Sequence, residues 1–410
     1  MEASYQRKQN HTDVGGNNQM RVYFAPCGIG LGHVGRCAPI ARRLVEKGAE
    51  VVFSTYQEGI KYVEQEGFPL IKAPPIGFQV RADGSIDFRQ TAINPGPFLA
   101  SFTLLEQINA EVRTIESYEP DVVISDSRAS PLLAAKLLDI PRICILNQFQ
   151  PRVPRRKRLL RLARFADIVT LTLIGKIWTS AKTVLIPDFP QPYTISEGNL
   201  TIPKPYRKNV RLIGPILPVR PGSLPSADEI RRKLMLPPDR PIIFAPVSGP
   251  TSEKAFVTGI LRRILLEFPE DYEIIMSYGY PSADIRPVRH GNVTIYKWIP
   301  NRFEYLKACD MVVGRAGHGT ITQCMCYGKP MILIPTPGHT EQISNANQAE
   351  NIGVARVVLQ ERLTRRRLLA DVQDTLRDEM KERASQVQVE ALRHDGLENA
   401  VKAVVEVAGK

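Results

Sequence analysis

The chain has 410 residues, more than a single domain usually contains, so two domains are the first expectation. Its hydrophobic content of 43% is ordinary for a globular protein, and no stretch approaches the ~20 consecutive apolar residues that span a bilayer, which excludes a chain anchored by such a helix. The net charge of +12, from 54 basic and 42 acidic side chains, favours a polyanionic partner: nucleic acid, an anionic membrane or phosphate groups.

The first 19 residues contain no apolar segment of the kind found in signal peptides, and they predict a disordered lead-in. The six cysteines are scattered, mostly in apolar runs. Cys324 and Cys326 lie close together, but no second pair of cysteines stands at the spacing of a zinc site. We therefore expect reduced thiols and an intracellular, cytoplasmic protein whose contact with any membrane is peripheral.

The fold proper begins with a βαβ unit whose first turn is rich in glycine. Strands are predicted over residues 21–26 and 49–55, with an amphipathic helix between them. A dinucleotide-binding fingerprint would need an acidic residue where the second strand ends, and that strand ends in Ser54 and Thr55. The glycines therefore predict a backbone that closes around a ligand; they are Gly28, Gly30 and Gly32.

Two polar residues are expected at one edge of the first sheet. His33 follows the glycine-rich turn, and Asp126 ends a buried strand predicted over residues 121–126. Each of them has a purely structural alternative as the N-terminal cap of the helix that follows it. The loop-rich stretch 61–97 is expected near the ligand-binding cleft at this edge of the sheet.

Residues 152–164 form a basic run with seven basic side chains and no acidic one, interleaved with leucines. Such a mixture suits a surface that lies on anionic lipid headgroups. Nucleic acid is a weaker alternative, because the run is short and lacks base-stacking aromatic residues. An ordinary solvated face without a binding role is the other alternative. The predicted membrane contacts are Arg155, Arg156, Lys157 and Arg158.

A proline-rich linker over residues 218–226 precedes a second series of strands and helices. In this second series, the segment 314–353 carries two loops that each follow a predicted strand and precede a predicted helix. Two helix N-termini would then meet at one sheet edge and hold a phosphorylated ligand. Glu341 and Asn345 are four residues apart on one helical face, so both could reach the same sugar or ribose.

This segment resembles the nucleotide-sugar signature of GT-B glycosyltransferases, in particular the subgroup that contains the lipid-linked N-acetylglucosaminyltransferase of peptidoglycan synthesis and the galactolipid synthases. The resemblance rests on Gly317-His318-Gly319-Thr320, on Gly328-Lys329-Pro330 with Pro335, and on Glu341-Gln342 with Asn345. Gln323 departs from it, since relatives usually carry glutamate there. The donor-binding residues that the loops and the resemblance indicate are Ser248, Gly249, Ile299, Arg315, Gly317, His318, Gly319, Thr320, Glu341, Gln342 and Asn345.

The resemblance implies an α/β fold of the GT-B type, with two Rossmann-like domains facing each other across a cleft. We expect an acceptor-binding domain over 20–217, a donor-binding domain over 227–390, and a last helix within 391–410 that returns to the first domain. The implied reaction is inverting transfer from a UDP-sugar to a lipid or lipid-linked acceptor, with His33 as general base and Asp126 orienting it. No cofactor, metal or nucleic acid is expected.

Two alternatives stay open at this stage. A UDP-sugar 2-epimerase has the same fold and would convert the donor without any acceptor. A non-catalytic module that binds a membrane or nucleic acid would not depend on His33. A glycosyltransferase that acts on a soluble small molecule is the variant within the same class.

Overall fold

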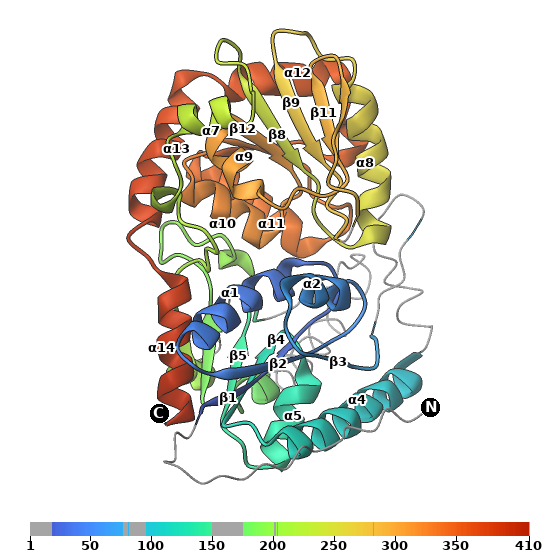
Figure 1. The fold of residues 1–410 in the computed structure, drawn as a ribbon, viewed down its shortest axis with the longest axis vertical. Helices are drawn as coiled ribbons and strands as arrows, with labels where there is room; N and C mark the ends of the chain where they lie inside the picture. Colours follow the sequence, from blue (N-terminus) through green and yellow to red (C-terminus); the bar gives the residue numbers. More distant parts are fainter. Residues whose placement is uncertain are drawn as a thin grey trace.

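The computed structural model describes residues 19–76, 81, 96–149, 175–200, 202, 204–281 and 283–409. They form two α/β halves, one above the other in Figure 1, each built around a seven-stranded sheet. The predicted GT-B-like arrangement of two Rossmann-like sheets is confirmed. The predicted membrane contacts Arg155, Arg156, Lys157 and Arg158 lie outside the described residues.

The N-terminal sheet has the strand order β3-β2-β1-β4-β5-β6-β7, and all of its pairings are parallel. Its inner strands β1 and β4 are buried almost throughout, as is typical of parallel strands with helices on both faces. The strands are β1 (Arg21–Pro26), β2 (Glu50–Thr55), β3 (Leu70–Lys72), β4 (Val122–Asp126), β5 (Arg142–Ile145), β6 (Thr183–Ile186) and β7 (Val210–Leu212). The helices are α1 (Gly32–Glu46), α2 (Glu58–Glu66), α4 (Gly96–Tyr118) and α5 (Ala129–Leu137), with short 3-10 helices η2 (Glu197–Asn199) and η3 (Lys204–Asn209).

The C-terminal sheet has the order β10-β11-β9-β8-β12-β13-β14 and is parallel except where β10 pairs with β11. Its strands are β8 (Ile242–Pro246), β9 (Glu273–Ser277), β10 (Val288–His290), β11 (Val293–Tyr296), β12 (Met311–Gly314), β13 (Met331–Leu333) and β14 (Ala355–Val357). Its helices are α7 (Ala227–Lys233), α8 (Thr251–Leu265), α9 (Arg302–Ala308), α10 (His318–Cys326), α11 (Thr340–Ile352), α12 (Arg365–Thr375) and α13 (Asp378–Ala391). Two more 3-10 helices are η4 (Pro221–Ser223) and η5 (Gln360–Arg362).

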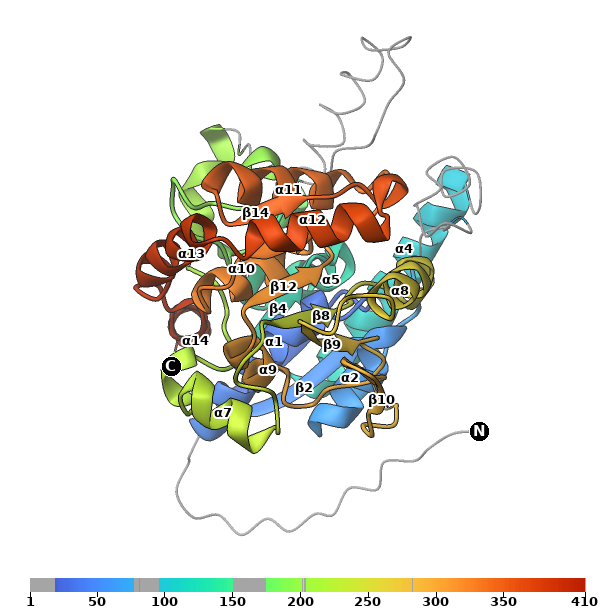
Figure 2. The same cartoon turned by 90° about the horizontal axis from the view of Figure 1, so that it is seen from above.

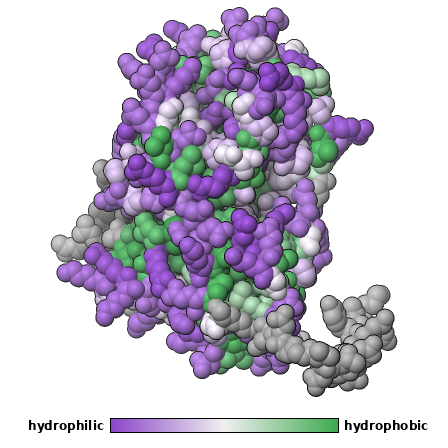
Figure 3. Space-filling model, turned by 60° about the vertical axis from the view of Figure 1, so that its left-hand side comes forward, coloured by the Kyte–Doolittle hydropathy of each residue, from purple (hydrophilic) through white to green (hydrophobic). Residues whose placement is uncertain are grey.

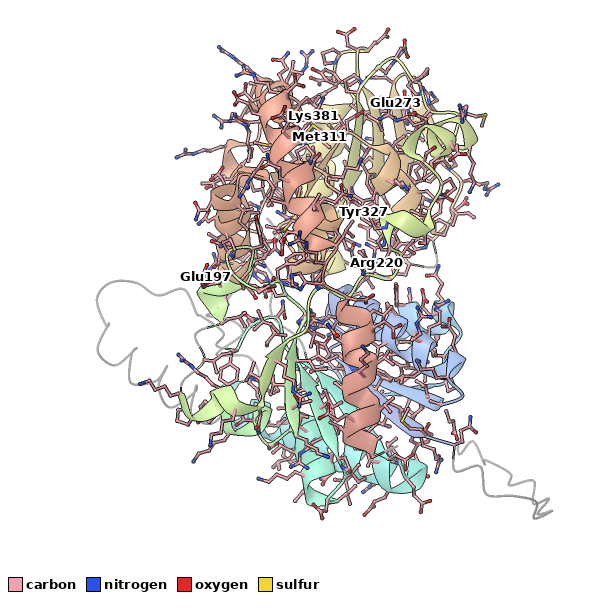
Figure 4. The ribbon with its side chains drawn as sticks, turned by 90° about the vertical axis from the view of Figure 1, so that its left-hand side faces the viewer. Glu197, Arg220, Glu273, Met311, Tyr327 and Lys381 are labelled. Atoms are coloured by element: carbon pink, nitrogen blue, oxygen red, sulfur yellow. The ribbon has the colours of Figure 1, made fainter. Side chains whose placement is uncertain are left out.

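The last helix, α14 (Gly396–Ala408), lies against the N-terminal half (Figures 1 and 4). Its apolar face joins the core on which α1 packs, through residues such as Val401 and Val404. The chain thus crosses between the halves twice, once before α7 and once after α13. Arg220 ties the two crossings together, because its guanidinium donates to the carbonyl of Leu392 at 2.6 Å and pairs with Asp395 at 3.2 Å.

The surface and the cysteines agree with a globular protein. Hydrophilic side chains cover most of the face in Figure 3, and apolar ones gather on its lower, N-terminal half. In the described part of the chain no helix is both long and apolar enough to span a membrane. All six cysteines are unpaired, and all but Cys27 are buried.

The two crossings pack backbone on backbone, and this contact generates a prediction. A Cβ on Gly396 would lie 2.1 Å from the carbonyl oxygen of Gly214, where φ is +85°. Gly396→Ala should therefore lower the free energy of unfolding by about 1–3 kcal/mol, the usual cost of overpacking. Gly222→Ala is the matched control, because a Cβ there meets nothing within 4 Å, and it should be nearly neutral. Denaturant unfolding measures both, and equal stabilities would contradict the tight crossing.

Candidate active site

The strand orders fix where each half can hold a ligand. In a doubly wound sheet the ligand site lies at the carboxyl ends of the two strands between which the order reverses. These strands are β1 and β4 in the N-terminal sheet, and β8 and β12 in the C-terminal sheet. The predicted residues follow these four strands: His33 after β1, Asp126 at the end of β4, Ser248 after β8 and Gly317 after β12.

The structure brings His33 and Asp126 into direct contact. His33 Nδ1 lies 2.7 Å from Asp126 Oδ1, the Asp126 side chain has no exposed surface, and the His33 side chain is 23% exposed. Because a carboxylate only accepts hydrogen bonds, Nδ1 carries the hydrogen in this contact. A neutral His33 ring therefore keeps a free lone pair on Nε2.

Neither residue serves as a helix cap, which was the structural alternative for each. Leu31 occupies the N-cap position of α1 and Arg128 that of α5, and neither helix has a side-chain cap hydrogen bond. His33 instead lies inside the first turn of α1. The contact between His33 and Asp126 is thus not explained by helix termination.

Arg36 completes the cluster, and sequence reasoning missed it. Its guanidinium makes a bidentate ion pair with Asp126, with Nη2 at 2.5 Å from Oδ1 and Nε bonded to Oδ2. Arg36 Nη2 also lies 3.0 Å from His33 Nδ1. The signal was present in the sequence, since His33 and Arg36 are three residues apart and share one face of α1.

The charges explain how a buried carboxylate stays ionised. Burial alone would raise the pKa of Asp126, but the Arg36 guanidinium and His33 outweigh it and lower that pKa to about 2. Burial likewise opposes the charge on Arg36, while Asp126 raises the pKa of Arg36. Asp126 is therefore a permanently charged partner for the His33 ring.

Two of the three predicted glycines shape the loop before His33. A Cβ on Gly28 would meet the Tyr56 carbonyl oxygen at 1.8 Å, so only glycine fits there. Gly30 has φ +67°, and a Cβ on it would lie 3.4 Å from Pro250 of the other half. Gly32 meets nothing within 4 Å. The glycine-rich loop therefore reaches across to the loop that opens α8.

The donor-side loops also meet at their switch point. Ser248 Oγ lies 3.5 Å from Thr320 Oγ1, which joins the loop after β8 to the first turn of α10. Gly317 is the N-cap of α10, with no side-chain cap, and Gly319 has open space where a Cβ would stand. Gly249 has φ +114°, a conformation that favours glycine. Backbone N–H groups at this helix N-terminus are available to an anion.

Several other predicted donor-binding side chains face inward instead. Arg315 is 3% exposed and donates to the carbonyls of Ile334 and Glu253, so it braces the loops from behind. Burial lowers the pKa of Arg315 to about 10, with Glu253 acting in the opposite direction. The Ile299 side chain is 3% exposed and belongs to the hydrophobic core, which leaves only its backbone to a ligand.

The polar residues Gln342 and Asn345 of helix α11 also bond to neighbouring loops of the protein. Gln342 accepts from the Thr336 backbone N–H at 3.0 Å and so holds the loop before α11. Asn345 has no exposed surface, and its Nδ2 donates to the Ala316 carbonyl at 3.5 Å. The prediction that Glu341 and Asn345 reach one sugar together is therefore not what the structure shows for Asn345, which holds the glycine-rich loop.

His318 and Glu341 contact the N-terminal half. His318 Nε2 lies 3.1 Å from Asp188 Oδ2, and both side chains are buried. Burial would raise the pKa of Asp188, but His318 and hydrogen bonds from Ser196 lower it. Glu341 is half-buried, and its Oε1 accepts a hydrogen bond from Asn147 Nδ2. Asp188 and Asn147 were not anticipated, since each acts on a residue far away in the chain.

A cavity of about 520 Å³ lies between the two halves, and none of the predicted site residues lines it. Ile29, Glu58 and Lys61 line it from the N-terminal half, and Glu253 and Tyr280 line it from the C-terminal half. Burial raises the pKa of Glu253 to about 7, against the opposing effect of Arg315.

The comparisons with known proteins agree with this geometry. The model of the glycosyltransferase family 28 C-terminal domain matches residues 253–400. An uncharacterized glycosyltransferase of Methanosarcina acetivorans is 27% identical over 346 residues, 83% of this chain and 86% of that protein. The UDP-N-acetylglucosamine–N-acetylmuramyl-(pentapeptide) pyrophosphoryl-undecaprenol N-acetylglucosamine transferase of Caldanaerobacter subterraneus is 26% identical over 388 residues, 89% of this chain and 94% of that protein.

The fold comparison extends over the whole molecule. The crystal structure of the calicheamicin glycosyltransferase CalG4 matches with a TM-score of 0.64 and 16% identity, covering 96% of this chain and 99% of that one. The chain is a glycosyltransferase with the GT-B fold, and its residues 253–400 are similar to the family 28 C-terminal domain. The resemblance noted in the sequence is thereby confirmed.

The ionised Asp126 of the glycosyltransferase gives a pH-dependent prediction. Its pKa is depressed from 3.8 to about 2, so its contribution to stability is complete above pH 3.8 and is lost as the pH falls towards 2. A depression of this size corresponds to about 2 kcal/mol. Between pH 4 and pH 2 the unfolding free energy should fall by about that much more for the wild type than for Asp126→Asn. Parallel pH profiles in denaturant titrations would contradict the pairing with Arg36 and His33.

Proposed function

We propose that this glycosyltransferase transfers a hexose or N-acetylhexosamine from a UDP-sugar to a lipid or lipid-linked acceptor, with inversion at the anomeric carbon and without a metal ion. The observation that carries the proposal is the His33–Asp126 contact, which lies where the strand order of the N-terminal sheet reverses. At the corresponding point of the C-terminal sheet, helices α8 and α10 begin. The family 28 match and the N-acetylglucosamine transferase relative support the choice of donor.

In the proposed mechanism His33 Nε2 takes the proton of the acceptor hydroxyl. The hydroxyl oxygen attacks the anomeric carbon of the donor sugar, and the bond from that carbon to the diphosphate breaks. UDP leaves with the electron pair, and backbone N–H groups at the start of α10 stabilise its charge. Asp126 holds the ring through Nδ1 and stabilises the imidazolium. Asp126 cannot itself be the proton acceptor, because it is fully buried and already paired.

A lipid acceptor is favoured by the surface of the N-terminal half as well as by the relative. Phe102 and Leu105 are 63% and 57% exposed on the same side of α4, whose first turns project from the body (Figure 2). Exposed apolar side chains in such a position suit an interface with lipid. The basic run 152–164 belongs to the same half of the sequence.

A soluble small-molecule acceptor is the second candidate, and the likeness to the calicheamicin glycosyltransferase favours it. Donor and acceptor can be identified separately. A panel of UDP- and GDP-sugars, each tested with and without EDTA, should yield one donor that raises the melting temperature most, because ligand bound only to the folded state stabilises it. Incubation of that donor alone should leave it unchanged; its conversion to a second sugar nucleotide would instead identify an epimerase.

The first functional prediction concerns His33. His33→Ala should leave donor affinity close to wild type and reduce turnover by about 10²–10⁴, the usual effect of losing a general base. His290→Ala is a matched control, because His290 is exposed on β10 and outside the cleft. Turnover measured at saturating donor decides the question, and a near-normal rate for His33→Ala would remove His33 from the mechanism.

The second concerns docking on a membrane. Wild-type protein should sediment with anionic phosphatidylglycerol vesicles, bind phosphatidylcholine vesicles poorly and be partly released by salt, since each basic side chain near the surface contributes about 1 kcal/mol. Replacing Arg155, Arg156, Lys157 and Arg158 by glutamine should remove the salt-sensitive part of that binding.

The double change Phe102→Ser and Leu105→Ser should remove the part of the vesicle binding that salt does not release, because it removes exposed apolar surface. Phe256→Ser is the control, because Phe256 is also exposed, at 43%, but lies on α8 in the other half. Efficient glycosylation of a soluble compound by protein that ignores anionic vesicles would refute the lipid acceptor.

A further inference from the structure

One side chain of the acceptor half links the donor-side carboxylate to the His33 cluster. Asn147 follows β5 and is 7% exposed. Its Oδ1 accepts from Arg36 Nη2 at 3.4 Å, and its Nδ2 donates to Glu341 Oε1 of the other half. A continuous series of contacts therefore runs from His33 through Asp126, Arg36 and Asn147 to Glu341.

The chemistry of its two partners fixes the orientation of the Asn147 amide. A guanidinium only donates hydrogen bonds and a carboxylate only accepts them, so the amide oxygen must face Arg36 and the amide nitrogen must face Glu341. Aspartate has the same shape but could satisfy only Arg36, and leucine could satisfy neither. The position thus requires a side chain that accepts on one side and donates on the other.

We infer that Asn147 is a positioning residue that sets the Glu341 carboxylate for the donor and the Arg36 guanidinium for Asp126 in a single arrangement. The inference rests on the proposed function and on the predicted role of Glu341, whose carboxylate would bind hydroxyl groups of the UDP-sugar donor. A carboxylate has about four acceptor positions, so Asn147 can occupy one and leave the others to the donor. Because Asn147 belongs to the acceptor half, a side chain of one half then positions the donor carboxylate of the other.

The same helix offers a matched control. Gln348, also on α11, donates to Glu197 of the N-terminal half at 3.1 Å, and Glu197 lies at the edge of the junction between the halves (Figure 4). This hydrogen bond joins the same two halves but touches neither Glu341 nor Arg36. Gln348→Ala therefore removes a contact between the halves without disturbing the proposed link.

The test is a double-mutant cycle on donor affinity, measured by calorimetry with UDP-N-acetylglucosamine, or with the nucleotide sugar that best stabilises the protein. Asn147→Ala should raise the dissociation constant about tenfold, the usual effect of losing a hydrogen bond to a charged group. Gln348→Ala should leave it unchanged. Adding Asn147→Ala to Glu341→Ala should give no further loss, because Asn147 would act through Glu341.

The outcomes separate this inference from the proposed function. Wild-type donor affinity in Asn147→Ala, or an undiminished effect of that change in the Glu341→Ala background, would overturn the positioning role. Unchanged affinity in Glu341→Ala would instead refute the donor role of Glu341.

Asn147→Asp keeps the acceptor for Arg36 but turns an oxygen towards Glu341, so it should bind donor more weakly than Asn147→Ala does. It decides the question if Asn147→Ala fails to fold, since donor affinity equal to wild type in Asn147→Asp would also overturn the role.

Discussion

A carboxylate with no exposed surface is the constraint on which the N-terminal half depends. Removing an ionised carboxylate from water costs several kcal/mol, and the cost is offset only by close, well-oriented partners. Arg36 and His33 supply them, and both lie in the first turns of α1. Asp126 ends β4 while α1 follows β1, so the pairing exists only because β1 and β4 are neighbours at the point where the strand order reverses.

The backbone beyond Asp126 is held as firmly as the carboxylate. Ser127 has φ +58°, a left-handed conformation that costs of order 1–3 kcal/mol when the residue is not glycine. This turn allows Arg128 to point away from the cleft, where it donates to Glu111 at 2.6 Å and to the Ser54 carbonyl at 2.9 Å. A second buried ion pair therefore fixes the strand end behind the first, and His33 rests against a partner that cannot easily shift.

The sequence predicted what depends on local pattern and missed what depends on long-range direction. Alternating strands and helices were enough to predict two parallel sheets, and residues after strands had to gather at the sheet edges. Asn345 shows the limit of spacing arguments: it is four residues from Glu341 on α11, yet it is fully buried while Glu341 meets the other half. Asn147 bonds a residue 194 positions away, and no local pattern carries that information.

The contacts between the halves differ in kind from one side of the molecule to the other. At the crossings, Gly214 and Gly396 pack backbone on backbone, and Arg220 clamps the returning chain. Along the cleft the halves meet through separate side-chain contacts, polar where Glu58 accepts from the Thr251 N–H at 3.2 Å and aromatic where Tyr62 meets Trp298. Replacing such a hydrogen bond by hydrogen bonds to water costs only about 0.5–1.5 kcal/mol. Water cannot replace the backbone packing at the crossings in this way.

This difference suits a two-substrate enzyme. We expect the halves to part on the cleft side while the crossings keep them in register, so that donor and acceptor can enter and both products can leave. Polar interfaces between domains permit such relative motion, and closure then restores the contacts that align the two substrates. In the proposed mechanism the cluster of His33, Asp126 and Arg36 lies within one half, and the residues expected to bind the donor come from the other.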